Sequence, residues 1–303
     1  GILFLLQRGS LSPIVAGALL GMLVVIDLNL SGAAFKDDGR SPADVYQLSP
    51  QAAASLKANV PSAFFRVKMR EGRTMLLSRN HGLTSDIFLI EGFAALYSQR
   101  LMPPAPDEAT SLDLMTVRYA IAIDSLQQSA YFDERNCRFP HARMVYRTLQ
   151  VPPDSVAAVM RSGKIDFENE AVVETPLAIS LSGFAKDSVA HKVRRTLYQP
   201  DAMQFDVETV EAGMLCLSEI WYPAWQATLD GRQTELHRTN YSLRGIEVPA
   251  GKHTVALRYE SQAFAVGAWI SGLALFTVGV ALVWLNKKPP AQTKNLNGES
   301  PTE

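Results

Sequence analysis

Few side chains in this sequence have the types and spacing of a catalytic site. The five histidines are scattered, and no two stand at the four-residue spacing of a helical metal site. The sequence contains neither a glycine-rich phosphate loop nor the Gly-x-Ser-x-Gly elbow of hydrolases. We therefore predict no metal site and no cofactor, and we assign no catalytic residue.

Glu219 is the carboxylate whose surroundings are most unusual, because apolar residues flank it within residues 217–223. A carboxylate in such a setting needs a partner, either a backbone turn or an arginine. The same setting could raise its pKa for general acid or base work. The structural interpretation is favoured, and the catalytic one stays open.

Aromatic residues are dense in the same part of the chain. Flat aromatic faces stack on sugar rings, but in small β domains they are also core residues, and Trp and Tyr gather at membrane interfaces. Asn240 stands beside one of these tyrosines and suits either a turn or a ligand contact. The candidate glycan-contact residues are Glu219, Trp221, Tyr222, Trp225, Asn240 and Tyr241.

An uncharged stretch of 23 residues, 263–285, precedes Lys287 and Lys288. A helix of this length is about 34 Å long at 1.5 Å per residue, enough to cross a hydrocarbon core of about 30 Å. Residues 11–30 predict a second span, weakened by Asp27, which is either an interfacial residue near the helix end or a functional acid within the membrane. The lipid bilayer is therefore the first predicted partner.

Positive charge beside the two spans sets the predicted topology. Arg8 precedes the first span and three lysines follow the second, so the ends lie in the cytoplasm and residues 31–262 lie outside. The predicted segments are a preceding helix end and turn (1–10), a span (11–30), an α+β region (31–192), a β region (193–262), a span (263–285) and a polar tail (286–303). The net charge of −1 gives no field to attract nucleic acid, and we predict no nucleic-acid partner.

Local patterns predict the elements of the external segment. Helices are expected at 49–58, 85–102 and 154–161, the last capped by Asp154, and strands at 64–77, 117–123 and 143–149. From residue 193 the pattern is β throughout, with strands at 203–210, 214–220, 241–248 and 253–259 and a two-residue hairpin turn at Asp230-Gly231. The fold class is a membrane-anchored α+β protein: two transmembrane helices flank a mixed α/β part and a C-terminal antiparallel β-sandwich.

The two cysteines, Cys137 and Cys216, would lie in a compartment that permits a disulfide. Cys216 sits in a strand-like run where a small buried thiol is common. Sequence spacing cannot show whether the two are close, so a bridge stays open.

Two blocks of sequence resemble the C-terminal signature of the bacterial YfhO family of membrane proteins. They are residues 217–231 (LSEIWYPAWQATLDG) and 238–255 (RTNYSLRGIEVPAGKHTV). Residues 112–121 (LDLMTVRYAI) and the segment from Asn136 through 140–143 (PHAR) are similar to earlier family segments. Residues 91–95 (EGFAA) stand where the family usually has Gly-Tyr-Asn-Pro, and Ala224 stands where Gly is usual. Because the Asn and Pro are missing, a binding role of the family at this helix start is not carried over to residues 91–95.

The resemblance implies a multi-pass protein of the bacterial inner membrane with a glycosyltransferase-C-like core. Such proteins transfer a sugar from a polyprenyl-phosphate donor to an envelope glycan or lipid, and their catalytic acids stand in a first external loop that this chain does not contain. Because the sequence begins at Gly1 with an apolar run, we expect it to be the C-terminal part of a longer protein. The alternative is a non-catalytic module for glycan binding or envelope assembly.

Overall fold

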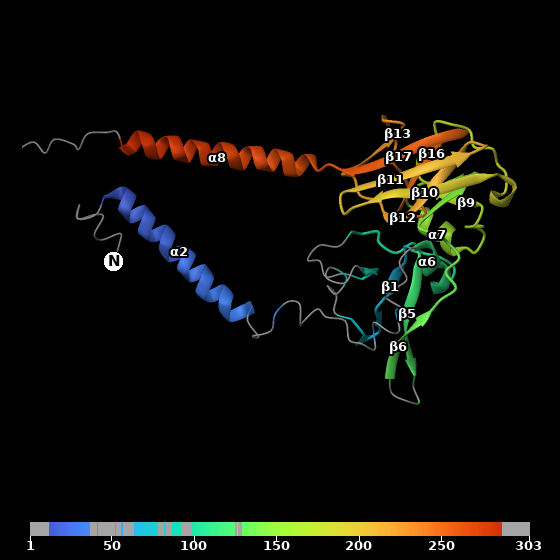
Figure 1. Ribbon diagram of the computed structural model, residues 1–303, viewed down its shortest axis with the longest axis horizontal. Helices are drawn as coiled ribbons and strands as arrows, with labels where there is room; N and C mark the ends of the chain where they lie inside the picture. The colour runs from blue at the N-terminus through green and yellow to red at the C-terminus, as the bar shows by residue number, and fades with distance from the viewer. Residues whose placement is uncertain are drawn as a thin grey trace, which may run out of the picture. The chain divides into compact units, whose positions relative to one another are not determined.

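The computed structural model describes residues 12–36, 64–77, 87–91, 98–124 and 129–286, and five single residues between them. These residues form a mixed α/β protein with many antiparallel strands (Figure 1). The chain divides into two compact units, Gly1–Leu96 with Val117–Asn136, and Tyr97–Thr116 with Cys137–Glu303. The predicted helix at 49–58 falls almost wholly outside the described residues.

The first unit contains a small mixed sheet in the order β4-β1-β5-β6. Its strands pair in parallel at β1 with β4 and with β5, and antiparallel at β5 with β6. Val67, Met69, Tyr119 and Phe132 are buried in its core. The described elements of this unit are α2 (Pro13–Lys36), β1 (Arg66–Lys68), β2 (Arg70–Glu71), β3 (Thr74–Met75), β4 (Phe88–Leu89), β5 (Val117–Asp124) and β6 (Ser129–Glu134).

The predicted helix at 85–102 is wrong for the residues that the structure describes there. Phe88 and Leu89 form strand β4, which pairs with Arg66 and Val67 of β1, and residues 98–102 are not helical. The apolar spacing that suggested a helix is local, whereas the pairing with β1 is a long-range contact that overrides it. Short apolar runs often carry this ambiguity.

The second unit is built on two sheets. A five-stranded antiparallel sheet has the order β10-β11-β17-β13-β14, and a six-stranded sheet has the order β7-β12-β16-β15-β9-β8. Its described elements are α6 (Glu108–Leu114), β7 (Ala142–Val145), β8 (Arg147–Gln150), α7 (Val156–Arg161), β9 (Glu170–Val173), β10 (His191–Tyr198), β11 (Ala202–Thr209), β12 (Gly213–Ile220), β13 (Trp225–Leu229), β14 (Arg232–Thr234), β15 (His237–Thr239), β16 (Leu243–Val248), β17 (Gly251–Tyr259), α8 (Gln262–Asn286) and a short 3₁₀ turn, Lys186–Ser188. Helix α7 begins after Ser155 rather than after Asp154.

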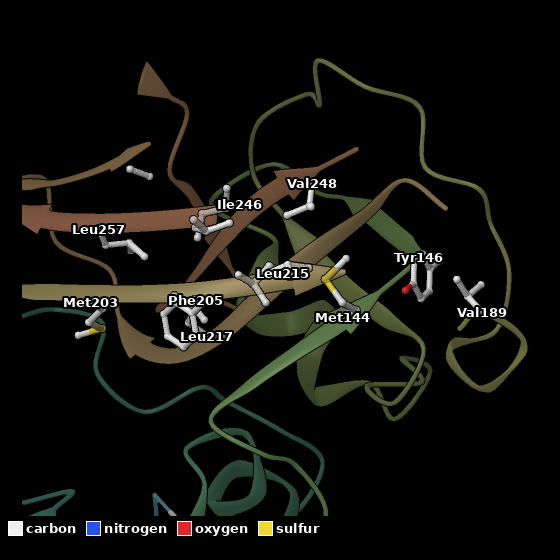
Figure 2. Packing of buried hydrophobic residues seen from close by; sticks show 13 residues of the cluster. Met144, Tyr146, Val189, Met203, Phe205, Leu215, Leu217, Ile246, Val248 and Leu257 are labelled. Atoms are coloured by element: carbon white, nitrogen blue, oxygen red, sulfur yellow. The ribbon is translucent and has the colours of Figure 1, made fainter. Parts of the chain in front are cut away.

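One hydrophobic core joins the two sheets. Figure 2 shows Phe205 and Leu257 of the five-stranded sheet beside Leu217 and Ile246 of the six-stranded sheet. All four side chains are fully or almost fully buried. Because every second residue of a strand faces the same side, Leu215 and Leu217 enter this core while Met214 and Cys216 enter a separate cluster on the opposite face.

The strand predicted at 143–149 is in fact two strands. Only Tyr146 separates β7 from β8, yet these strands occupy opposite edges of the six-stranded sheet. One intervening residue spans at most about 7 Å between its neighbours, so the sheet must curl until its edges meet at Tyr146. The smaller cluster packs Val145 of β7 together with Val173 of β9 and with Met214 and Cys216 of β12. Strands β8 and β9 pair in parallel, so this sheet is mixed.

The hairpin predicted at Asp230-Gly231 is confirmed. Both residues have positive φ, 52° and 78°, and Leu229 pairs with Arg232 across the turn. Cys137 and Cys216, which both lie among the described residues, are not joined by a disulfide, and this answers the question that the sequence left open.

Helix α8 is, among the described residues, the one helix long and apolar enough to cross a membrane by length and composition. None of its apolar window is buried against protein, and large side chains such as Trp269 and Phe276 are exposed along it. Such a surface requires a lipid or protein partner. Helix α2 covers the first predicted span, but its apolar stretch, Val15–Ser31, is shorter than the roughly 20 residues that a span needs, so that span stays a prediction.

Candidate functional site

Three of the predicted aromatic residues lie in the loop between β12 and β13 or at its end. Trp221 directly follows β12 and is fixed at two points: its backbone N–H donates to Ser242 O at 2.7 Å, and its indole Nε1 donates to Leu236 O at 3.0 Å. Its ring stays half-buried. Tyr222 is exposed, and Trp225 begins β13 with its ring half-buried.

Two arginines cover the two tryptophan rings. Arg238 and Arg244 are directly opposite each other in the β15–β16 pair. The guanidinium carbon of Arg238 lies 4.1 Å from the centre of the Trp221 ring, and that of Arg244 lies 4.0 Å from the centre of the Trp225 ring. These are cation–π contacts, and they leave each indole only one face for any other partner.

A strained turn connects the strands that carry these arginines. Asn240 and Tyr241 both have positive φ, 47° and 78°, which places them in the left-handed region of backbone conformation that residues other than Gly rarely adopt. Asn240 is fully buried, and its side-chain oxygen takes the place of a backbone acceptor. Its Oδ1 accepts from Val172 N at 2.9 Å, and its backbone N–H donates to Val172 O at 2.8 Å. The turn is therefore tied to strand β9.

Tyr241 is part of an arginine–carboxylate network. Arg100 lies over its ring, with the guanidinium carbon 4.9 Å from the ring centre, and the same Arg100 pairs with Glu174. Arg238 approaches the other oxygen of Glu174 at 3.7 Å. One nearly buried carboxylate thus holds two arginines, which in turn lie over Tyr241 and Trp221. We call Trp221, Tyr241, Arg100, Arg238 and Glu174 the aromatic–arginine site.

Glu219 lies apart from this network, inside the protein. Its Oε1 lies 2.8 Å from His141 Nε2 and accepts from the Tyr198 hydroxyl at 3.3 Å. Arg195 approaches the other ring nitrogen of His141 at 3.4 Å. This is the partnered arrangement that a buried carboxylate requires, and it joins β12 to β10 across the core.

Buried polar groups elsewhere behave as structural groups. Burial raises the pKa of the Cys216 thiol, and burial lowers the pKa of the Arg143 guanidinium, its cross-strand neighbour. No cluster of His, Cys, Asp or Glu among the described residues could hold a metal ion.

Residues 157–271 match the model of a family described as bacterial membrane protein YfhO. This segment belongs to the YfhO family. The match confirms the resemblance stated from the sequence blocks, since it contains both of them. Searches among curated proteins and among solved structures each found no match to this chain.

The YfhO segment contains all six predicted contact residues, the hairpin that carries Arg238, and the beginning of α8. Arg100, Cys137 and His141 stand before it. YfhO proteins are described as bacterial membrane proteins, which agrees with the exposed apolar surface of α8.

Sequence reasoning missed the arginines of the site. A usable signal was present: Arg238 and Arg244 each stand three residues from Tyr241, so a hairpin centred there must pair them. Arg100 and Glu174 had no such signal, because they reach the site through contacts between segments more than 70 residues apart in the chain.

Proposed function

We propose that this chain belongs to a multi-pass membrane protein of the glycosyltransferase-C-like kind, and that its external β-rich unit holds an acceptor glycan. The donor in this proposal is a polyprenyl-phosphate sugar, and the acceptor is an envelope glycan or lipid. The YfhO match and the membrane-length helix α8 support this reading. Residues 31–262 lie outside the inner membrane in this scheme.

The observation that carries the proposal is the aromatic–arginine site. Sugars offer flat faces of C–H bonds together with hydroxyl groups, and a half-exposed ring beside fixed hydrogen-bond donors matches both features. The side chains of Arg100 and Arg238 are 23% and 29% exposed, so both can reach a ligand while Glu174 holds them in place. A preorganised donor loses less conformational entropy on binding than a free one.

The buried candidates have a different role. Asn240 has no exposed surface, and Glu219 is bonded to His141 and Tyr198, so neither presents a free polar group outward. In this proposal they position the loop and the turn that carry Trp221 and Tyr241.

The test is a complementation experiment with the full-length gene in a strain that lacks it. Tyr241→Gly removes the ring but suits the positive φ at this position, and Arg238→Ala removes the donor over Trp221. Arg194→Ala is the matched control, because Arg194 is an ion-paired surface arginine on the outside of the other sheet. We expect both site variants to change the sugar composition of the envelope glycan and the control to restore it; normal composition with both site variants contradicts the proposal.

A second candidate function is a non-catalytic module for glycan binding or envelope assembly. The carboxylate of the site favours it: Glu174 is paired with both Arg100 and Arg238, an arrangement that holds two hydrogen-bond donors in place for binding. Unaltered glycan composition in the deletion strain, together with loss of glycan binding in Tyr241→Gly, would select the module.

A further inference from the structure

Three aromatic side chains gather where the five-stranded sheet meets helix α8. Tyr222 and Tyr259 stack with ring centres 6.3 Å apart and an interplanar angle of 25°. Trp225 meets Tyr259 edge-on at 5.7 Å, and these two are direct partners in the β13–β17 pair. Tyr222 is 50% exposed and Tyr259 is 39% exposed. We call these three residues the rim cluster.

The rim cluster is joined to α8 by a short and well-bonded connection. Only Glu260 and Ser261 separate Tyr259 from Gln262, the first residue of α8, and Figure 1 shows β17 leading directly into the helix. The backbone N–H of Glu260 donates to Ala224 O at 2.8 Å, and the Ser261 hydroxyl accepts from Phe264 N at 3.2 Å as a helix cap. A flexible linker is therefore absent between these described residues.

The length of this connection fixes the depth of the cluster. Three residues span at most about 11 Å even when fully extended. The headgroup layer on one side of a bilayer is about 5–7 Å thick. If the hydrocarbon begins at the first turn of α8, Tyr259 and its partner Trp225 lie in the headgroup layer or at its outer surface.

We propose that the rim cluster rests in the headgroup layer of the bilayer that α8 crosses, and that this contact seats the β-rich unit on the membrane. Tyrosine and tryptophan suit this layer because each has an apolar ring and a polar tip. Charged residues of both signs lie beside the cluster: Glu260 follows Tyr259, the Tyr259 N–H donates to Asp201 O, and the guanidinium of Arg244 lies over the Trp225 ring. The aromatic rings, rather than a net charge, therefore define the contact. The partner is the zwitterionic headgroup and acyl boundary.

This inference rests on the membrane-crossing part of the proposed function and divides the predicted contact residues. Tyr222 and Trp225 contact lipid, whereas Trp221 and Tyr241 remain for the glycan. The division follows from attachment: the first two lie against Tyr259, and the last two lie against Arg238 and Arg100.

Tryptophan fluorescence of the full chain in phosphatidylcholine vesicles tests the inference. Nitroxide groups are placed on the lipid headgroup in one set of vesicles and at the end of the acyl chain in another. A variant with Trp221, Trp269 and Trp284 replaced by Phe keeps Trp225 alone. A second variant, W221F/W225F, keeps the two tryptophans of α8 and reports whether the helix lies in the bilayer.

Two added tryptophans give a matched pair in case the multiple replacement impairs folding. Tyr222→Trp marks the rim, and Phe184→Trp marks a residue of similar exposure, 53%, near the opposite end of the sheets. Its place follows from two hydrogen bonds. The backbone N–H of Gly183, the residue before Phe184, donates to Tyr146 O, and the Tyr146 hydroxyl is hydrogen-bonded to Thr209, at the end of β11 that is distant from the rim cluster. That end is roughly 25 Å away along the eight residues of β11.

We expect the headgroup nitroxide to quench Trp225 and the added Tyr222→Trp at least about twofold more than Phe184→Trp, because the far end lies well beyond the headgroup layer. Replacing part of the phosphatidylcholine by phosphatidylglycerol should leave this ratio unchanged. Equal quenching at Tyr222→Trp and Phe184→Trp, with the α8 tryptophans quenched by the acyl-chain nitroxide, overturns the inference and leaves the span intact. If the α8 tryptophans are not quenched, the membrane-crossing part of the proposed function fails as well.

Discussion

The turn at Asn240 makes a prediction whose size can be worked out from two separate contributions. Its side-chain oxygen replaces a missing strand partner for Val172 N, and its backbone is held at a φ of 47°. Substitution by Ala removes both the acceptor and the tolerance for positive φ. Substitution by Gly removes the acceptor alone. The two variants therefore separate the hydrogen bond from the backbone conformation.

Loss of the acceptor leaves a buried N–H without a partner, which costs about 1–3 kcal/mol in the free energy of unfolding. Holding an Ala in the left-handed region costs roughly a further 1–2 kcal/mol. Gly avoids that cost but loses about 0.5–1 kcal/mol through the greater freedom of its unfolded chain. We expect both variants to be destabilised, with Asn240→Ala about 0.5–1 kcal/mol less stable than Asn240→Gly.

The measurement is denaturant unfolding of the full chain in detergent, followed by tryptophan emission, since Trp221 is bonded to Ser242 beside the turn. Asn136→Ala is the control, because Asn136 is exposed and has no positive φ, and its change should stay within about 0.5 kcal/mol. Equal stability of Asn240→Ala and Asn240→Gly would refute the argument from backbone strain. Wild-type stability in both would refute the argument from the hydrogen bond.

Three further substitutions or reactions follow from packing and burial. Gly245→Ala should cost about 1–3 kcal/mol of stability by denaturant unfolding, because the added methyl would meet a threonine methyl at 2.3 Å and a methionine sulfur at 2.8 Å. Glu219→Ala should cost about 1–3 kcal/mol in the same assay by removing the carboxylate that is hydrogen-bonded to the buried His141 ring, and His141→Ala should cost a similar amount. Under native conditions a maleimide should label half-buried Cys137 and not Cys216, whose pKa is raised by burial; mass spectrometry that finds both labelled at similar rates would contradict this.

The part of the fold that sequence reasoning predicted well is the part governed by local alternation. Strands expected at 203–210 and 214–220 appear as β11 and β12 within a residue or two, and the apolar stretch at 263–285 lies within α8. The turn at Asp230-Gly231 required only that two adjacent residues accept positive φ. In each case neighbours in the sequence determine the outcome.

Long-range pairing explains the errors. The sequence predicted one strand at 143–149, but its two halves pair with β12 and with β9, and only these distant partners reveal the break at Tyr146. The helix predicted at 85–102 failed for the same reason, since β4 exists only through β1. Sequence periodicity carries no information about which distant segment supplies the partner.

The candidate site was found in part because its aromatic residues are visible in the sequence, but their roles depend on neighbours that are not. Trp221 and Trp225 look equivalent, four residues apart in one short loop. The structure gives them different environments: Arg238 joins the first to the network around Glu174, and register with Tyr259 joins the second to the end of β17.

This difference arises because the loop connects the two sheets. The chain leaves β12 at Trp221 and enters β13 at Trp225, so the loop crosses from the six-stranded sheet to the five-stranded sheet. Only the five-stranded sheet continues into α8, through β17. An aromatic residue on that side of the loop is therefore tied to the start of α8, whereas one on the other side is tied to the Asn240 turn. Trp225 is held by its pairing with Tyr259 as well as by Arg244 of the hairpin. Under the two proposals, a substitution that loosens the turn should therefore disturb the proposed glycan contact more than the proposed lipid contact of Trp225. Asn240→Gly examined by headgroup quenching tests this, and loss of the quenching of Trp225 would contradict it.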